Sequence, residues 1–184
     1  MRTFSAMAVT ALILLAMTAG PSSAGLVDVG IGVYGGLNRP VEDDASSGSM
    51  FGAKVRVVPP IPMVGFEGYY TRMNTKDPDE FWNDVTDIDI EDGDFDVAGL
   101  SVLIGNVGGI GGLKLFGVVG VNYVQFAKDG SDSEWKQGGD LGVGAEFELP
   151  IVGLAAEVRG TYVILGWGED RSLWTASAGV NFFF

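Results

Sequence analysis

The stretch from Asp140 to Pro150, DLGVGAEFELP, alternates between two kinds of residue. Glycines or carboxylates occupy the even-numbered positions up to Glu148, and every odd-numbered position is apolar. The apolar residues are Leu141, Val143, Ala145, Phe147 and Leu149. A period of two places successive side chains on opposite faces of a β-strand. The stretch therefore predicts a strand with one apolar face and one face of glycine and charge.

The same alternation recurs along the chain and predicts eight antiparallel strands. Their ranges are 26–35, 50–58, 63–73, 96–105, 113–126, 140–149, 154–166 and 173–184. Four apolar residues break the pattern, because they fall on the polar faces: Val97, Leu103, Phe116 and Val118. The connections 58–63, 106–112 and 150–153 are tight, whereas 36–49, 74–95, 127–137 and 167–172 are longer or more polar. Short and long connections in alternation are typical of an up-and-down β-barrel.

The first 24 residues have the anatomy of a secretory signal peptide. Arg2 precedes an apolar core over 6–17, and small residues lead to a predicted cleavage site after Ala24. The alternative is a transmembrane helix, but such a helix needs roughly 20 apolar residues, and the core over 6–17 is shorter than that. We expect residues 25–184 to form one domain.

Composition excludes several classes of function. The chain has 24 acidic and 11 basic residues and a formal net charge of −13, so it lacks the basic stripe that nucleic-acid binding needs. It contains no Cys and no His, which removes the usual nucleophile–base pairs and zinc ligands. We expect neither an enzyme nor a cofactor or metal site.

The side chains indicate which face of the barrel points inward. A soluble lipocalin-like barrel would hold its apolar face inside, and a membrane barrel the reverse. Glycines on the polar face would relieve crowding in a narrow interior. Aromatic residues on the apolar face cluster near both strand ends, as two membrane interfaces favour. They are Phe51, Tyr70, Tyr123, Tyr162 and Trp174 at the long-loop ends, and Phe66, Phe147, Phe182 and Phe184 at the tight-turn ends. The predicted fold is an all-β, eight-stranded antiparallel transmembrane barrel.

With its alternating strands, signal sequence and final Phe, the chain resembles the small outer-membrane barrels of the OmpX and OmpA-barrel kind. The resemblance implies a monomer in the bacterial outer membrane, surrounded by membrane lipids and lipopolysaccharide. It also implies that Val180, Phe182 and Phe184, on one face of the last strand, form the signal read by the barrel-assembly machinery.

The polar faces predict an ion-pair network inside the barrel, because isolated buried charges cost several kcal/mol each. Its expected members are Asp28, Lys54, Arg56, Glu67, Lys114, Asp140, Glu146, Glu148, Glu157 and Arg159. The network either fills the barrel or acts as a gate. The resemblance to the OmpA barrel suggests the gate, in which exchange of partners opens a narrow path.

The connection 74–95 is strongly acidic and includes Asp87, Asp89 and Glu91. It does not match the EF-hand calcium pattern, because Ile88 and Ile90 occupy ligand positions. We expect a solvated extracellular loop, which divalent ions could bridge to lipopolysaccharide phosphates. Phe81 and Trp82 in this loop are candidate contact points for a partner. The sequence thus favours a structural or surface-interaction role, and the alternative is a narrow gated pore or a conduit for small solutes, hydrophobic ones included.

Overall fold

The computed structural model describes residues 27–41, 47–61, 63–74, 94–107, 112–126, 135–149, 153–167 and 172–184. The predicted signal peptide and the acidic loop residues 75–93 lie outside these ranges. Among the described residues, no helix is both long and apolar enough to cross a membrane.

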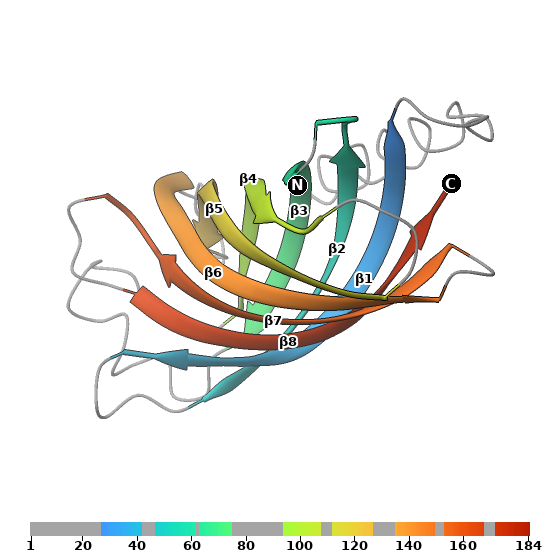
Figure 1. Ribbon diagram of the computed structural model, residues 1–184. Coiled ribbons are helices and arrows are strands. Elements are labelled where there is room, and N and C mark those ends of the chain that lie inside the picture. Colours follow the sequence, from blue (N-terminus) through green and yellow to red (C-terminus); the bar gives the residue numbers. More distant parts are fainter. Residues whose placement is uncertain are drawn as a thin grey trace.

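Eight strands form one closed antiparallel barrel, which confirms the predicted fold class. The strands are β1 (Asp28–Pro40), β2 (Gly48–Val58), β3 (Val64–Asn74), β4 (Asp94–Gly105), β5 (Gly112–Phe126), β6 (Trp135–Leu149), β7 (Leu154–Ile164) and β8 (Ser172–Phe183). Each strand pairs with the next along the chain, and β1 closes the barrel against β8 (Figure 1). Closure removes the unpaired strand edges that would otherwise need partners.

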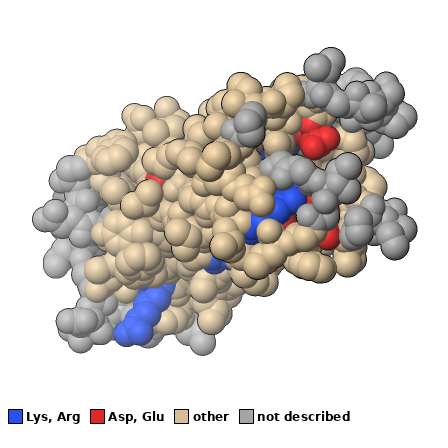
Figure 2. Space-filling model, viewed as in Figure 1, with Lys and Arg blue, Asp and Glu red and all other residues tan. Residues whose placement is uncertain are grey.

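The outer wall of the barrel is apolar. Val143 at the middle of β6 is 70% exposed, and the face shown in Figure 2 carries charged atoms in only a few places. Other exposed apolar residues on the wall include Val33, Leu100, Leu115, Leu141 and Val158. This distribution is the reverse of that in a soluble barrel with an apolar interior.

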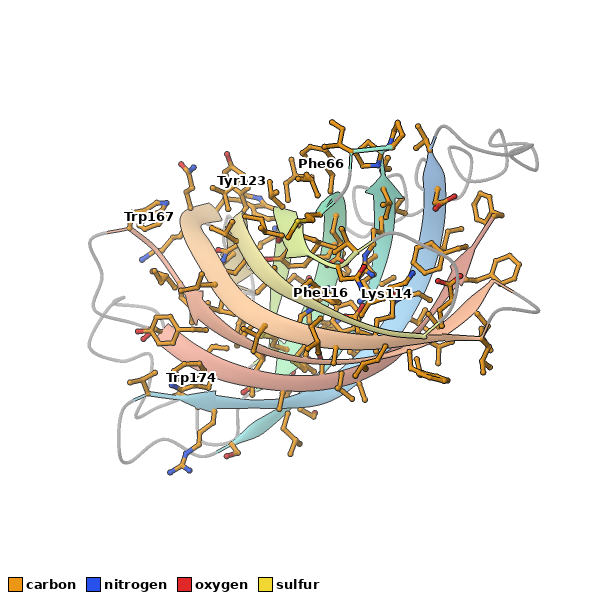
Figure 3. All side chains as sticks on the ribbon, viewed as in Figure 1. Phe66, Lys114, Phe116, Tyr123, Trp167 and Trp174 are labelled. Carbon is orange, nitrogen blue, oxygen red and sulfur yellow. The ribbon has the colours of Figure 1, made fainter. Side chains whose placement is uncertain are left out.

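Aromatic side chains project outward near the two ends of the wall. We call the end with the long connections the loop side and the other end the turn side. Tyr123 and Trp174 lie at the loop side and Phe66 at the turn side (Figure 3). Trp135 and Trp167, which the sequence analysis placed in loops, are also exposed at the loop side.

Of the strands that extend past their predicted loop-side ends, β1 and β6 extend furthest. β1 continues to Pro40, because Gly36–Asn38 pair with both β2 and β8. β6 begins at Trp135 and pairs Gly138 and Gly139 with β5. Neighbouring glycines resemble a turn signal in sequence, but here they occupy positions within paired strands.

Two apolar layers lie inside the barrel. The loop-side layer is Met50, Met73, Phe95, Val97, Val124, Val163, Leu165 and Leu173. The turn-side layer is Val58, Leu103, Val107, Phe116 and Val118. The four residues that broke the sequence pattern therefore face inward, as their position predicts. Val97 belongs to the loop-side layer, and Leu103, Phe116 and Val118 belong to the turn-side layer.

Adjacent glycines on β1 allow a direct test of crowding inside the barrel. A Cβ atom added to Gly36 would lie 2.0 Å from the backbone oxygen of Ala176, whereas one added to Gly35 would meet nothing closer than 3.5 Å. We expect Gly36→Ala to lower the free energy of unfolding by about 1–3 kcal/mol, because overpacking forces the backbone to move. Gly35→Ala on the outer face is the matched control and is expected to be neutral in urea unfolding. Equal effects of the two substitutions would contradict the crowded interior.

Candidate functional site

The candidate site is a network of charged side chains in the barrel interior. Arg56 on β2 faces Glu67 on β3 directly across the strand pair, and its Nη2 lies 2.9 Å from Glu67 Oε2. The same guanidinium reaches across the barrel: Nη1 lies 2.7 Å from Glu146 Oε2 and Nη2 lies 2.5 Å from Glu157 Oε2. Arg56 therefore connects three carboxylates from three different strands.

Arg159 and Lys54 complete the centre of the network. Arg159 Nη1 lies 2.6 Å from Glu67 Oε1, and its Nη2 lies 3.0 Å from Glu157 Oε1. Lys54 Nζ lies 2.5 Å from the same Glu157 oxygen. Each of these two glutamates thus contacts more than one cation, which offsets the cost of burying its charge.

Lys114 forms a second branch near the turn side. Its Nζ lies 2.5 Å from Glu148 Oε2 and 3.9 Å from Glu146 Oε1. The ammonium also lies 5.7 Å from the centre of the inward-facing ring of Phe183, within the range of a cation–π contact. Lys114 and Phe116 both appear within the barrel in Figure 3.

Asn181 and Phe116 belong to the site although the sequence analysis did not include them. The Asn181 amide donates hydrogen bonds to Glu146 at 2.7 Å and Glu157 at 2.9 Å. The ring of Phe116 lies 5.2 Å from the Arg56 guanidinium carbon and 5.6 Å from that of Arg159. The available signal for Asn181 was its place on the polar face of the last strand.

Two predicted members stand apart from the network. Asp28, the first residue of β1, is exposed at the turn-side rim and forms no ion pair with another described residue. Asp140 lies nearer the loop side than the glutamates and forms no ion pair with the network cations. It accepts hydrogen bonds from Tyr69 and Ser101 instead.

The geometry also determines which partners could exchange in a gate. Arg159 contacts Glu67 and Glu157, while Glu146 contacts Arg56.

Above the network is a cavity of about 40 Å³, lined on one side by Lys54, Arg159 and Asp140 and on the other by residues of the loop-side apolar layer. A cavity of this size accommodates a few water molecules.

The predicted assembly signal lies on the outer wall of β8. Val180 and Phe182 are exposed, and the rings of Phe182 and Phe184 lie 6.1 Å apart. The predicted surface residues Phe81, Trp82, Asp87, Asp89 and Glu91 lie outside the described part of the chain.

Several solved structures have a similar fold. The N-terminal β-barrel domain of Pseudomonas aeruginosa OprF superposes with a TM-score of 0.59 at 16% identity, covering 85% of this chain and 97% of that one. Ail of Yersinia pestis, solved with the heparin analogue sucrose octasulfate, gives a TM-score of 0.54 at 19% identity, with coverage of 87% and 100%. Neisserial surface protein A gives a TM-score of 0.54 at 15% identity, with coverage of 89% and 100%.

No family model matches the sequence, and no curated protein sequence matches it. The likeness is therefore one of architecture. The chain has the fold of small eight-stranded outer-membrane β-barrels.

Proposed function

We propose that this chain, whose fold is that of the small eight-stranded outer-membrane barrels, is an outer-membrane protein with a structural or surface-interaction role. The observation that carries the proposal is the reversed distribution of side chains. The charged network formed by Arg56, Glu67 and Arg159 with its neighbours is buried, while apolar residues such as Val143 are exposed on the wall. Exposing such a wall to water would be unfavourable, and lipid would cover it.

The connections support an orientation in the membrane. The start of β1 and the residue after β8 lie side by side at the turn side, where the backbones of Val29 and Phe184 exchange hydrogen bonds of 3.5 and 3.0 Å. Outer-membrane barrels carry short turns on the periplasmic side and longer loops outside. We therefore assign the turn side to the periplasm and the loop side to the exterior.

The acidic loop is the proposed contact surface. Asp87, Asp89 and Glu91 would meet lipopolysaccharide phosphates through bridging divalent cations, and Phe81 and Trp82 would contact a partner directly. Ail was solved with a sulfated sugar analogue, an anionic ligand. The acidity of residues 75–93 here argues against a polyanion as a direct ligand of this loop.

The filled interior favours this role over the pore alternative. The ion-pair network occupies the turn side of the barrel, and the loop-side apolar layer lies above it. A ring of apolar side chains opposes ion passage, because water does not wet a narrow apolar constriction. A pore would require both the ion-pair network and the loop-side apolar layer to rearrange.

Conductance across a planar lipid bilayer tests the proposal. We expect the full chain to insert and to give no unitary current steps at fixed salt, with a reference channel in the same membrane as the control for sensitivity. Persistent steps that Arg159→Ala alters would instead establish a gated pore. A folded product that stays soluble and does not insert would contradict the membrane assignment.

A further inference from the structure

Asp140 is a buried carboxylate that the ion-pair network does not neutralise. Among the described residues on the turn side of the loop-side apolar layer, the buried or nearly buried cations are Lys54, Arg56, Lys114 and Arg159. The buried or nearly buried carboxylates there, other than Asp140, are Glu67, Glu146, Glu148 and Glu157. These eight charges pair with one another. Among the described side chains of this part of the interior, Asp140 is therefore one carboxylate in excess.

The partners of Asp140 are neutral. Its Oδ1 accepts a hydrogen bond of 2.9 Å from the Tyr69 hydroxyl, and its Oδ2 accepts one of 3.0 Å from Ser101 Oγ. Ser101 and Asp140 lie on either side of Gly120, which pairs with both. The side chains of Ser101 and Asp140 use the space over Gly120, because a Cβ there would lie 2.5 Å from Ser101 Oγ and 2.7 Å from Asp140 Oδ1.

Asn122 is a second observation that points to a ligand at this position. It is 0% exposed, and neither its Nδ2 nor its Oδ1 has a hydrogen-bond partner among the described residues. Asn122 pairs with Gly138, two residues before Asp140, so the two side chains are diagonal neighbours on the inner face. Leaving both ends of a buried amide unpaired is unfavourable unless something else binds them.

We propose that Asp140, Asn122, Ser101 and Tyr69 form a binding site for one monovalent metal cation of the Na⁺ class. All four supply oxygen atoms, which hard cations prefer, and a single positive charge balances the excess carboxylate. A divalent ion fits less well, because the described residues contain no cluster of three potential acidic, His or Cys ligands. This inference concerns the barrel interior and does not depend on the proposed role of the loops.

The neighbouring cavity supplies the rest of the coordination. Its volume of about 40 Å³ leaves room for water molecules beside Asp140 and Tyr69, both of which line it. Lys54 and Arg159 line the same cavity, but each is already paired with Glu157. They therefore do not replace the proposed cation at Asp140.

Equilibrium urea unfolding of the full chain from phosphatidylcholine vesicles tests the site, in NaCl and in choline chloride at equal ionic strength. A ligand that binds only the folded state stabilises it by mass action. Above the dissociation constant for Na⁺, we expect the folding equilibrium constant to rise about tenfold for each tenfold increase in Na⁺. Choline is too large for the cavity, so we expect the folding equilibrium constant not to change with the choline concentration.

Asp140→Asn removes the charge with little change in shape and is expected to abolish the Na⁺ dependence. Asp94→Asn is the control, since Asp94 is a partly exposed carboxylate paired with Arg72 at the loop-side rim. If Asp140→Asn does not fold, Ser101→Ala retains the charge and is expected to shift the response to higher Na⁺. Equal stability of the unaltered chain in the two salts would overturn the proposal, as would an undiminished Na⁺ response in Asp140→Asn or, should that variant not fold, in Ser101→Ala.

Discussion

Replacing Arg56 by methionine is expected to lower the free energy of unfolding by about 3–5 kcal/mol. Its side chain is 2% exposed and contacts Glu67, Glu146 and Glu157 at 2.9, 2.7 and 2.5 Å. Methionine retains much of the side-chain volume but leaves carboxylates in the interior with fewer cations. Removing one partner from a buried ion pair costs more than the pair itself contributes, because the remaining charge stays desolvated.

Equilibrium urea unfolding in vesicles, followed by tryptophan fluorescence, measures this loss. Arg72→Met is the matched control: Arg72 Nη2 lies 2.8 Å from Asp94 Oδ2, but its side chain is 49% exposed. Exposed pairs contribute about 0–1 kcal/mol, so this substitution should change little. If Arg56→Met and Arg72→Met were equally mild, the interior charges would have to be hydrated, and a water-filled path would become the better model.

Val143→Arg is expected to destabilise the barrel in a bilayer by about 2–4 kcal/mol, the cost of arginine on the lipid face at the midplane. Val143 lies near the middle of β6, faces outward and is 70% exposed. In water, an arginine at so exposed a position would be readily solvated and would cost little. The prediction therefore tests the membrane assignment directly.

Leu37→Arg is the matched control for depth in the membrane. Leu37 is also exposed on the wall, but it lies two residues before Arg39, which is itself exposed near the loop-side end of β1. Arginine near the interface costs about 0–1 kcal/mol. The free energies of unfolding of the two variants in vesicles should differ clearly. Equal losses would indicate that the cost of arginine on the wall does not depend on depth in the way that a bilayer requires.

The sequence allowed the barrel and its two faces to be predicted, because period-two alternation depends only on local strand geometry. It was less informative where a residue's role depends on neighbours across the barrel. Asp140 and Glu146 occupy the same face of one strand, yet Glu146 contacts Arg56 while Asp140 accepts hydrogen bonds from Tyr69 and Ser101. That difference follows from how high each residue sits in the barrel, which depends on strand register.

The ends of the strands show the same limit. Gly138 resembles a turn residue in sequence, but a Cβ there would lie 2.0 Å from the backbone oxygen of Ile164, so a larger residue would not fit the paired strand. The apolar residues Val97 and Phe116 on polar faces were recognised as exceptions. The reason why these apolar residues face inward depends on the assembled interior, where Val97 packs in the loop-side layer and Phe116 lies beside two guanidinium groups.

The ion-pair network also constrains the order in which the protein can fold. Arg56 and Glu157, which lie 2.5 Å apart, are separated by 101 residues along the chain. No early hairpin contains both charges, so a partly formed sheet entering the membrane would carry unpaired ions and open edges into lipid. Such long-range contacts favour slow, concerted assembly, in which closure of the barrel brings the charges of β2 and β7 together and neutralises the interior in the same event.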